Sequence, residues 1–250
     1  MRPRRTAYSH GMSDLQCPAT LLIARHGDAD YRVRGVRTDD GGWLTAKGRE
    51  QVRLLVEQVR PRRVAAVYSS RMGRAVESAE LAATGLGLRP VAVDGLQEFS
   101  VGDLEGVDLQ DPRAQEVFDG WLAGELDAAC PGGEDGHAVV SRFGDALEAI
   151  ADRHRGETVL IFAHGGVMAF AVPRLSTNGR NNPAAQRFLP NCVPVEVEVD
   201  ADGWRLISWP GAADQVMVTG GDRRQVRHKD QVTDEDKDQV TDEDKGHVTV

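Results

Sequence analysis

Two apolar runs that each end in a histidine followed by glycine constrain this chain most. Residues 21–28 read LLIARHGD and residues 158–166 read TVLIFAHGG. Short, fully apolar runs of this kind are typical of strands buried inside a parallel sheet. In open α/β sheets, ligands bind in the crevice outside the carboxyl ends of the strands. The two runs therefore predict a parallel sheet with a site at the strand ends that carry His26 and His164.

The rest of the chain alternates between helix and strand patterns. Helical stretches with apolar residues at i, i+3, i+4 and i+7 follow short apolar strands. Residues 193–199, VPVEVEV, alternate as a half-exposed strand does, and residues 204–209 supply a partner. We therefore expect an α/β three-layer sandwich, in which a mainly parallel central sheet is flanked by helices and has an antiparallel margin near the C-terminal end of the domain. The other expected elements are helices over 45–61, 70–87, around 117–122, 135–153 and 167–175, and strands over 64–68 and 91–93.

The domain organisation follows from length and patterning. A chain of 250 residues fits one generous domain. We expect a flexible N-terminal segment over 1–18, a single domain over 19–210 and a disordered acidic tail over 211–250. The tail contains the octapeptide DQVTDEDK twice in tandem, at 230–237 and 238–245. Two copies of a polar octapeptide are too few and too short for a repeat fold, which favours disorder.

Composition limits the partners and the location. The formal charge of -9 and the pI near 5.3 argue against a dedicated nucleic-acid binder. No apolar run approaches membrane-spanning length, and the basic N-terminus lacks the apolar region of a secretory signal. The three cysteines are widely spaced and form no CxxC pair, which suits a reducing compartment. We therefore expect a soluble cytoplasmic protein that binds neither nucleic acid nor membrane.

The residues at the two strand ends describe an anion pocket that contains a nucleophile. The planar guanidinium of Arg25 matches a phosphate group. A neutral imidazole at His26 can attack phosphorus, and Gly27 lets a tetrahedral phosphoryl group approach the backbone. His164 ends the second run, and Gly165 lies at the start of a helix, where free N–H groups favour an anion.

Two further residues are expected in this pocket. Arg74 lies in the first turns of the helix after the second strand, where it can supply a second guanidinium. Glu98 lies in the loop after the third strand and is a candidate general acid, because the leaving group of a phosphomonoester needs a proton. The same carboxylate can then activate water.

Five motifs that occur in a fixed order give the chain a resemblance to a known family. They are RHG at 25–27, SSRMGRAVESA at 69–79, LQEFSVGDLEG at 96–106, PGGE at 131–134 and HGG at 164–166. With these motifs the chain resembles the histidine phosphatase superfamily, which has the phosphoglycerate mutase-like fold, in its larger branch. The resemblance covers roughly residues 19–210.

The resemblance implies a mechanism as well as a fold. It implies that His26 is the nucleophile that becomes phosphohistidine. Arg25, Arg74 and His164 would complete the phosphate pocket, and Glu98 would act as proton donor and then as base. The implied activity is hydrolysis of a small phosphorylated substrate, with no metal and no cofactor, on a mainly parallel sheet flanked by helices.

Two other functions are open on the sequence. One is phosphoglycerate mutase-type phosphoryl transfer, although mutases of this superfamily typically have a longer insertion between the residues that correspond to Glu98 and His164. The shorter segment here favours hydrolysis. The other is a catalytically weak binding module of the same fold, whose acidic tail recruits a partner.

Two alternative sites are also conceivable. Imidazole and carboxylate suit several divalent ions, so His26, His164, Asp28 and Asp30 could form a metal site, but a neighbouring arginine disfavours a cation there. Glu105 could replace Glu98 as the acid, although its setting before a glycine is typical of a structural turn.

Overall fold

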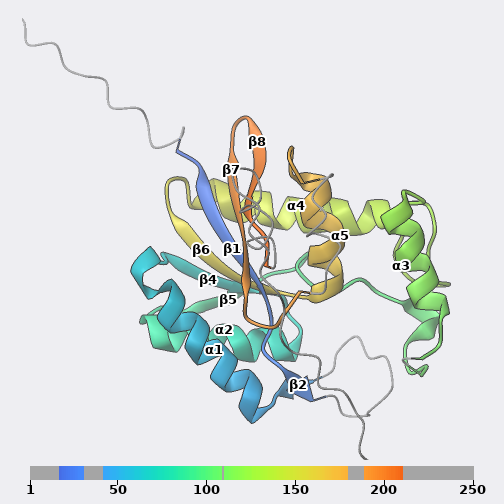
Figure 1. Ribbon diagram of the computed structural model, residues 1–250, viewed down its shortest axis with the longest axis horizontal. Helices are drawn as coiled ribbons and strands as arrows, with labels where there is room; N and C mark the ends of the chain where they lie inside the picture. Colours follow the sequence, from blue (N-terminus) through green and yellow to red (C-terminus); the bar gives the residue numbers. More distant parts are fainter. Residues whose placement is uncertain (1–16, 31–41, 109, 180–188, 211–250) are drawn as a thin grey trace, which may run out of the picture. The chain divides into compact units, whose positions relative to one another are not determined.

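The computed structural model describes residues 17–30, 42–108, 110–179 and 189–210, all within the compact unit Met1–Val216. Its centre is a six-stranded sheet of order β5-β4-β6-β1-β7-β8 (Figure 1). The strands of this sheet are β1 (Ala19–Arg25), β4 (Ala66–Ser69), β5 (Pro90–Ala92), β6 (Thr158–Ala163), β7 (Pro194–Asp200) and β8 (Gly203–Ser208). The helices are α1 (Ala46–Val59), α2 (Gly73–Leu86), α3 (Arg113–Ala123), α4 (Gly136–Arg153) and α5 (Gly165–Leu175), with short 3-10 turns η2 (Arg60–Arg62) and η3 (Gly102–Leu104).

The strands pair mainly in parallel. β5, β4, β6 and β1 pair in parallel with one another, whereas β7 pairs antiparallel with both β1 and β8. The antiparallel margin consists of the two strands that the sequence places over 193–199 and 204–209. The predicted α/β fold with a mainly parallel sheet is therefore confirmed.

The sheet separates two hydrophobic layers. Side chains of a strand alternate between faces, so Leu21 and Ile23 of β1 pack in one cluster with residues of α4 and α5. Leu22 and Ala24 of the same strand pack in a second cluster with residues of α1 and α2. Figure 1 shows these two helix pairs on opposite sides of the sheet. The uninterrupted apolar run of β1 thus reflects burial on both faces.

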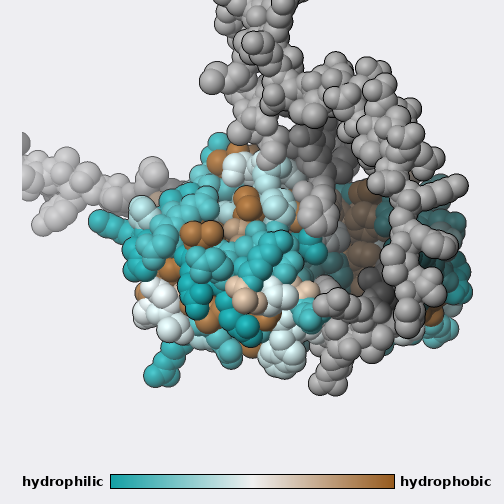
Figure 2. All heavy atoms as spheres, turned by 60° about the horizontal axis from the view of Figure 1, so that its bottom comes forward, coloured by the Kyte–Doolittle hydropathy of each residue, from teal (hydrophilic) through white to brown (hydrophobic). Residues whose placement is uncertain are grey.

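The outer surface near α1 and α2 is mostly polar. Over the left part of Figure 2, the described residues form a hydrophilic surface on which hydrophobic residues lie in small separate spots. Leu54 of α1 is among the exposed large hydrophobic residues, at 62%. Scattered exposed apolar residues of this kind are normal for a folded domain.

Side-chain caps define where two helices begin. The Thr45 hydroxyl accepts a hydrogen bond from the Gly48 N–H at 3.0 Å at the start of α1, which makes Thr45 the N-cap of this helix. Asp135 does the same for the N–H of Ala138 at the start of α4, at 2.8 Å. At its other end α1 stops at Val59 and is followed by the 3-10 turn η2. Pro61 lies in the first turn of η2, where the missing N–H of proline costs no hydrogen bond within the helix.

The region between the first strand and the first helix differs from expectation. The sequence pattern assigns no strand between the first apolar run and the helix over 45–61, but β2 (Ala29–Asp30) pairs antiparallel with β3 (Trp43–Leu44). Strands of two residues have no periodicity, so the sequence pattern cannot reveal them. Residues 31–41 lie outside the described part of the chain.

Two predictions concern residues that are mostly outside the described ranges. These are the flexible segment over 1–18, of which only residues 17–18 are described, and the acidic tail over 211–250. Both stay predictions. Among the helices in the described ranges, none combines the length and the apolar character needed to cross a membrane.

Candidate active site

The carboxyl ends of three neighbouring strands bring the candidate residues together. β1 lies beside β6, and β6 lies beside β4, all parallel. His26 directly follows β1, His164 directly follows β6, and Ser70 directly follows β4. The N–H of His26 donates to the carbonyl of Ala163 at 3.0 Å, which ties the first strand end to the second. As a result the two imidazole rings lie with their centroids 5.3 Å apart.

Hydrogen bonds define the tautomer of His26. Its Nδ1 lies 2.7 Å from the carbonyl oxygen of Gly27, and a carbonyl can only accept, so Nδ1 carries the proton. Nε2 is therefore unprotonated, and it accepts a hydrogen bond from Nε of Arg74 at 3.0 Å. The lone pair that could attack an electrophile thus lies beside a fixed positive charge.

Burial and neighbouring charges keep His26 neutral. Its side chain is only 3% exposed, and burial followed by the charge of Arg74 lowers its pKa to about 3. The bond to the Gly27 carbonyl opposes this by favouring the protonated form, while Arg25 adds to the lowering. The imidazole is therefore uncharged throughout the neutral range.

His164 is fully buried and serves as the N-cap residue of α5. Its Nε2 lies 2.7 Å from the hydroxyl of Ser70, whose oxygen also accepts from the N–H of Met72 at 3.3 Å. Nδ1 of His164 has no hydrogen-bond partner within the described part of the chain. Burial, and then the charge of Arg74, lower the pKa of His164 well below its usual value.

Two arginines flank the histidine pair. Arg74 is 4% exposed in the first turn of α2, and Arg25 is the last residue of β1. A Cβ added to Gly165 would lie 3.3 Å from Cδ of Arg25, so the first residue of α5 lets the Arg25 side chain lie close against the helix start. The site therefore combines two guanidinium groups with two neutral imidazoles, an arrangement suited to an anion.

Gly27 is required for packing as well as for the site. A Cβ at Gly27 would lie 2.7 Å from the carbonyl oxygen of Gly48, and a Cβ at Gly48 would lie 2.0 Å from the carbonyl oxygen of Asp28. The first turn of α1 and the end of β1 are therefore in direct backbone contact. The N–H of Gly27 donates to the Ser78 hydroxyl at 3.1 Å. A phosphate-binding role of Gly27 stays a prediction.

Glu98 occupies the N-terminal end of α5. Its Oε2 accepts from the N–H of Gly166 at 2.9 Å and its Oε1 from the N–H of Val167 at 2.6 Å. Free N–H groups at a helix start favour a carboxylate. In this structure the N–H of Gly166 is therefore occupied by the Glu98 carboxylate. The same contact explains why α5 begins at Gly165 and not at the predicted Val167.

Sequence reasoning assigned no role to several residues of the site. Ser70 bonds His164, Ser78 bonds the backbone after His26, and Nδ2 of Asn191 donates to the His26 carbonyl at 2.6 Å. Ser70 follows a predicted strand end, so the rule that identified the histidines could have identified it as well. Asn191 lies far along the chain, and no motif marks it.

Neither alternative site is assembled. Within the described ranges, no group of three or more His, Cys, Asp or Glu side chains is placed to hold a metal ion. Asp28 instead accepts a hydrogen bond from the Thr45 hydroxyl at 2.7 Å. Glu105 is exposed and follows η3.

Comparison with known proteins gives consistent matches. The family described as "Histidine phosphatase superfamily (branch 1)" matches residues 21–210. Phosphoglycerate mutase-like protein 4 of Arabidopsis thaliana is 28% identical over 208 residues, 81% of this chain and 89% of the relative. The metal-independent phosphoserine phosphatase of Arabidopsis thaliana is 29% identical over 198 residues, 76% and 80% of the two chains. The solved structure of YhfR from Bacillus stearothermophilus superposes with a TM-score of 0.63 at 30% identity, covering 75% of this chain and 95% of that one.

Proposed function

Since this chain belongs to the histidine phosphatase superfamily, we propose that it is a metal-independent phosphatase that hydrolyses a small phosphomonoester through a phosphohistidine at His26. The observation that carries the proposal is the state of His26, a buried neutral imidazole whose unprotonated Nε2 faces Arg74. A neutral imidazole offers a lone pair to phosphorus, while the guanidinium attracts the phosphoryl oxygens.

Arg25, Arg74 and His164 hold the phosphoryl group in the proposed complex. The two guanidinium groups offset the charge of the dianion and can each donate two hydrogen bonds. Nδ1 of His164, which has no other partner in the described chain, donates to a phosphoryl oxygen when it carries the proton. The N–H of Gly165, at the first position of α5, adds a further donor.

In the first step, Nε2 of His26 attacks phosphorus and the bond from phosphorus to the leaving oxygen breaks. The leaving oxygen takes its proton from the carboxyl group of Glu98, which enters this step in its protonated form. The imidazole that bears the phosphoryl group gains positive charge, which the carbonyl of Gly27 at Nδ1 stabilises. The same hydrogen bond keeps the ring in the orientation that presents Nε2.

In the second step, water attacks the phosphorus atom of the phosphohistidine. Glu98, now a carboxylate, accepts a proton from that water. The bond between phosphorus and Nε2 breaks, its electron pair returns to Nε2, and inorganic phosphate leaves. Each group is then in its starting state.

The turnover of a generic aryl phosphate tests the nucleophile. We expect His26→Ala to lower turnover of 4-nitrophenyl phosphate by at least about 10³-fold, because removal of a catalytic nucleophile is among the most costly active-site changes. The matched control is His137→Ala, since the His137 side chain is 64% exposed on α4 and pairs with Asp127 at 3.5 Å. A rapid-quench experiment should trap acid-labile phosphate on the wild-type protein but not on His26→Ala. Equal turnover in both proteins, or none in the wild type, would contradict the proposal.

Hydrolysis and mutase chemistry differ in their products. The relatives carry names of both kinds, and the short segment between Glu98 and His164, with α3 as its one helix before α4 in the described ranges, supports hydrolysis. We expect release of inorganic phosphate without a bisphosphoglycerate primer. Primer-dependent isomerisation of phosphoglycerate with little release of phosphate would reverse this choice.

The proposed place of action is the cytoplasm. Cys17, Cys130 and Cys192 are all free thiols, which supports a reducing compartment. The acidic composition supports a small phosphorylated molecule, and not nucleic acid, as the partner.

A further inference from the structure

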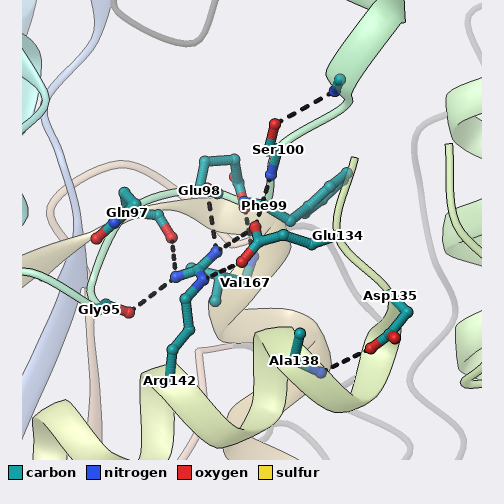
Figure 3. Close-up of polar contacts among 11 residues, drawn as sticks. Gly95, Gln97, Glu98, Phe99, Ser100, Glu134, Asp135, Ala138, Arg142 and Val167 are labelled. Atoms are coloured by element: carbon teal, nitrogen blue, oxygen red, sulfur yellow. Dashed lines mark hydrogen bonds and ion pairs between the residues drawn. The ribbon is translucent and has the colours of Figure 1, made fainter. Parts of the chain in front are cut away.

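Arg142 of α4 binds the loop that carries Glu98. A guanidinium has five N–H donors, and the five hydrogen bonds of Arg142 account for all of them. Three bonds go to carbonyl oxygens of that loop, those of Gly95 at 2.8 Å, Gln97 at 2.9 Å and Glu98 at 3.2 Å. Figure 3 shows the guanidinium inserted between these carbonyls and the carboxylate of Glu134. The planar fork thus fixes three carbonyls within four consecutive residues.

Glu134 completes the attachment on the other side. Its two oxygens accept from Nε and Nη2 of Arg142 at 2.5 and 2.9 Å, a bidentate pair. Oε2 of Glu134 also accepts from the N–H of Ser100 at 2.8 Å, two residues after Glu98. The Arg142–Glu134 pair, shown in Figure 3, therefore holds the loop both before and after Glu98.

Backbone contacts leave little space for this loop to move. A Cβ at Gly95 would lie 2.7 Å from the carbonyl oxygen of Arg142, and a Cβ at Gly133 would lie 2.7 Å from that of Ser100. Both positions are therefore restricted to glycine by close approach of the neighbouring main chain. The loop lies directly against α4 and against the segment before it.

Glu98 is consequently held through both its main chain and its side chain. Its carbonyl accepts from Arg142, and its carboxylate accepts from the N–H groups of Gly166 and Val167. The first contact comes from the helix α4 and the second from the helix α5. A shift of the loop would change the position of the carboxyl group, and misplacement of a catalytic group by about 1 Å can cost about 10²-fold in rate.

We propose that Arg142 is the positioning residue for Glu98: its bidentate pair with Glu134 and its three carbonyl bonds hold the loop so that the Glu98 carboxyl reaches the leaving oxygen. This inference rests on the proposed function, in which Glu98 protonates that oxygen. A lysine cannot replace Arg142, because an ammonium has three donors at one point and no planar fork. The same pair would be expected to stabilise the fold, so the test must separate position from stability.

Two aryl phosphates that differ in leaving group make this separation. 4-Nitrophenyl phosphate releases a weakly basic phenolate that needs little protonation, whereas phenyl phosphate releases a more basic one, with a pKa of about 10 as for tyrosine. We expect Arg142→Lys and Arg142→Ala to lower kcat/KM for phenyl phosphate about tenfold more than for 4-nitrophenyl phosphate. General acid catalysis typically contributes about 10² to 10⁴-fold, so a tenfold selective loss is a partial loss of it. Glu134→Gln should show a smaller loss of the same kind.

The lysine variant keeps the positive charge that contributes to the low pKa of His164, so a selective loss in it reports on geometry. The matched control is Arg155→Ala: Arg155 is also 20% exposed and binds a carbonyl, that of Val199 at 3.2 Å, together with Asp152. It should leave the ratio of the two kcat/KM values at the wild-type level. If Arg142→Ala does not fold, as judged by circular dichroism, Arg142→Lys decides by the same ratio.

The outcomes distinguish the inference from the proposed function. Glu98→Gln should show the selective loss in full; if it does not, the acid role of Glu98 fails, and the inference fails with it. If Glu98→Gln shows the selective loss but the Arg142 variants lose equal activity on both substrates, or none, only the inference is overturned.

Discussion

Nε of Arg74 lies 3.0 Å from Nε2 of His26 and donates a hydrogen bond to it. The unprotonated nitrogen of the imidazole is thus held beside a permanent cation before any substrate is bound. Burial disfavours a charged imidazole, and protonation of that nitrogen would also place two positive charges in contact, so the imidazole stays neutral.

The pH dependence of activity should reflect this pair. Because burial and Arg74 lower the pKa of His26 to about 3, we expect no loss of kcat/KM from protonation of His26 as the pH falls through 6.5. A nuclear magnetic resonance titration of the imidazole should show no charge change between pH 8 and pH 5. A midpoint near 6.5 for His26 would contradict the assignment.

The same shift predicts a stability effect. The folded pKa of His26 is below its unfolded value, so the unfolded chain binds more protons between about pH 6.5 and pH 3, and stability falls as the pH is lowered through this window. The slope from this one group is at most about 1.4 kcal/mol per pH unit. Urea denaturation should show a weaker acid dependence for His26→Gln than for the wild type.

Arg74 should be essential for turnover. Arg74→Ala removes a buried guanidinium from the site, and we expect kcat/KM to fall about 10² to 10³-fold, as for the loss of one donor to a transition-state charge. The control is Arg71→Ala, because Arg71 is 63% exposed and pairs with Asp94 on the surface. Its kcat/KM should stay within about twofold of the wild type. An exposed ion pair contributes little to the stability of the fold, so its loss should leave the active site intact. A comparable fall in both variants would argue against a specific role of Arg74.

Gly166→Ala should impair both stability and activity. The added methyl group would lie 2.8 Å from Oε1 of Glu98 and 2.6 Å from Cε1 of Phe99, so either the carboxylate or the ring must move. We expect overpacking to cost about 1–3 kcal/mol in the free energy of unfolding, with reduced turnover. Gly120→Ala, in α3, would meet only the flexible Glu125 side chain at 3.3 Å and should be neutral or stabilising. Thermal unfolding and turnover of both variants check this, and a fully active Gly166→Ala would contradict it.

The acidic tail should be dispensable for catalysis. Deletion of residues 221–250 removes both copies of the octapeptide but none of the proposed site residues. We expect unchanged kcat/KM and an unchanged unfolding temperature, because a polar repeat of this kind cannot bury enough apolar surface to form a packed element. Loss of both folding and activity in the shortened protein would show that the tail is part of the domain.

The sequence was informative where side chains are buried in a regular pattern. The apolar runs of β1 and β6 predicted interior parallel strands, and the rule for strand ends correctly placed His26 beside His164. The antiparallel margin followed from the alternation in β7. These features depend on local periodicity, which a single sequence records.

Contacts between distant segments were not predictable in the same way. The carboxylate of Glu98 binds the start of α5, although the two lie 68 positions apart in the sequence. With these N–H groups capped, the helix begins at Gly165. Arg142 binds carbonyls of a loop 44 to 47 positions away, although its own sequence context is that of an ordinary amphipathic helix. Every residue has a main-chain carbonyl, so the residue type does not indicate which carbonyls accept such bonds, and no spacing rule predicts them.

The backbone contact between Gly27 and Gly48 limits which substitutions this site can accept in evolution. The end of β1 rests on the first turn of α1 through close main-chain contacts, and the side chains of Thr45 and Gln51 add hydrogen bonds to Asp28. Side chains hold the attacking residue as well, since Arg74 donates to its Nε2 and Asn191 donates to its carbonyl. A methyl group at either glycine would collide with the facing main chain, so either replacement should displace the strand end that carries the nucleophile, and a natural variant could keep the reaction only by keeping both glycines.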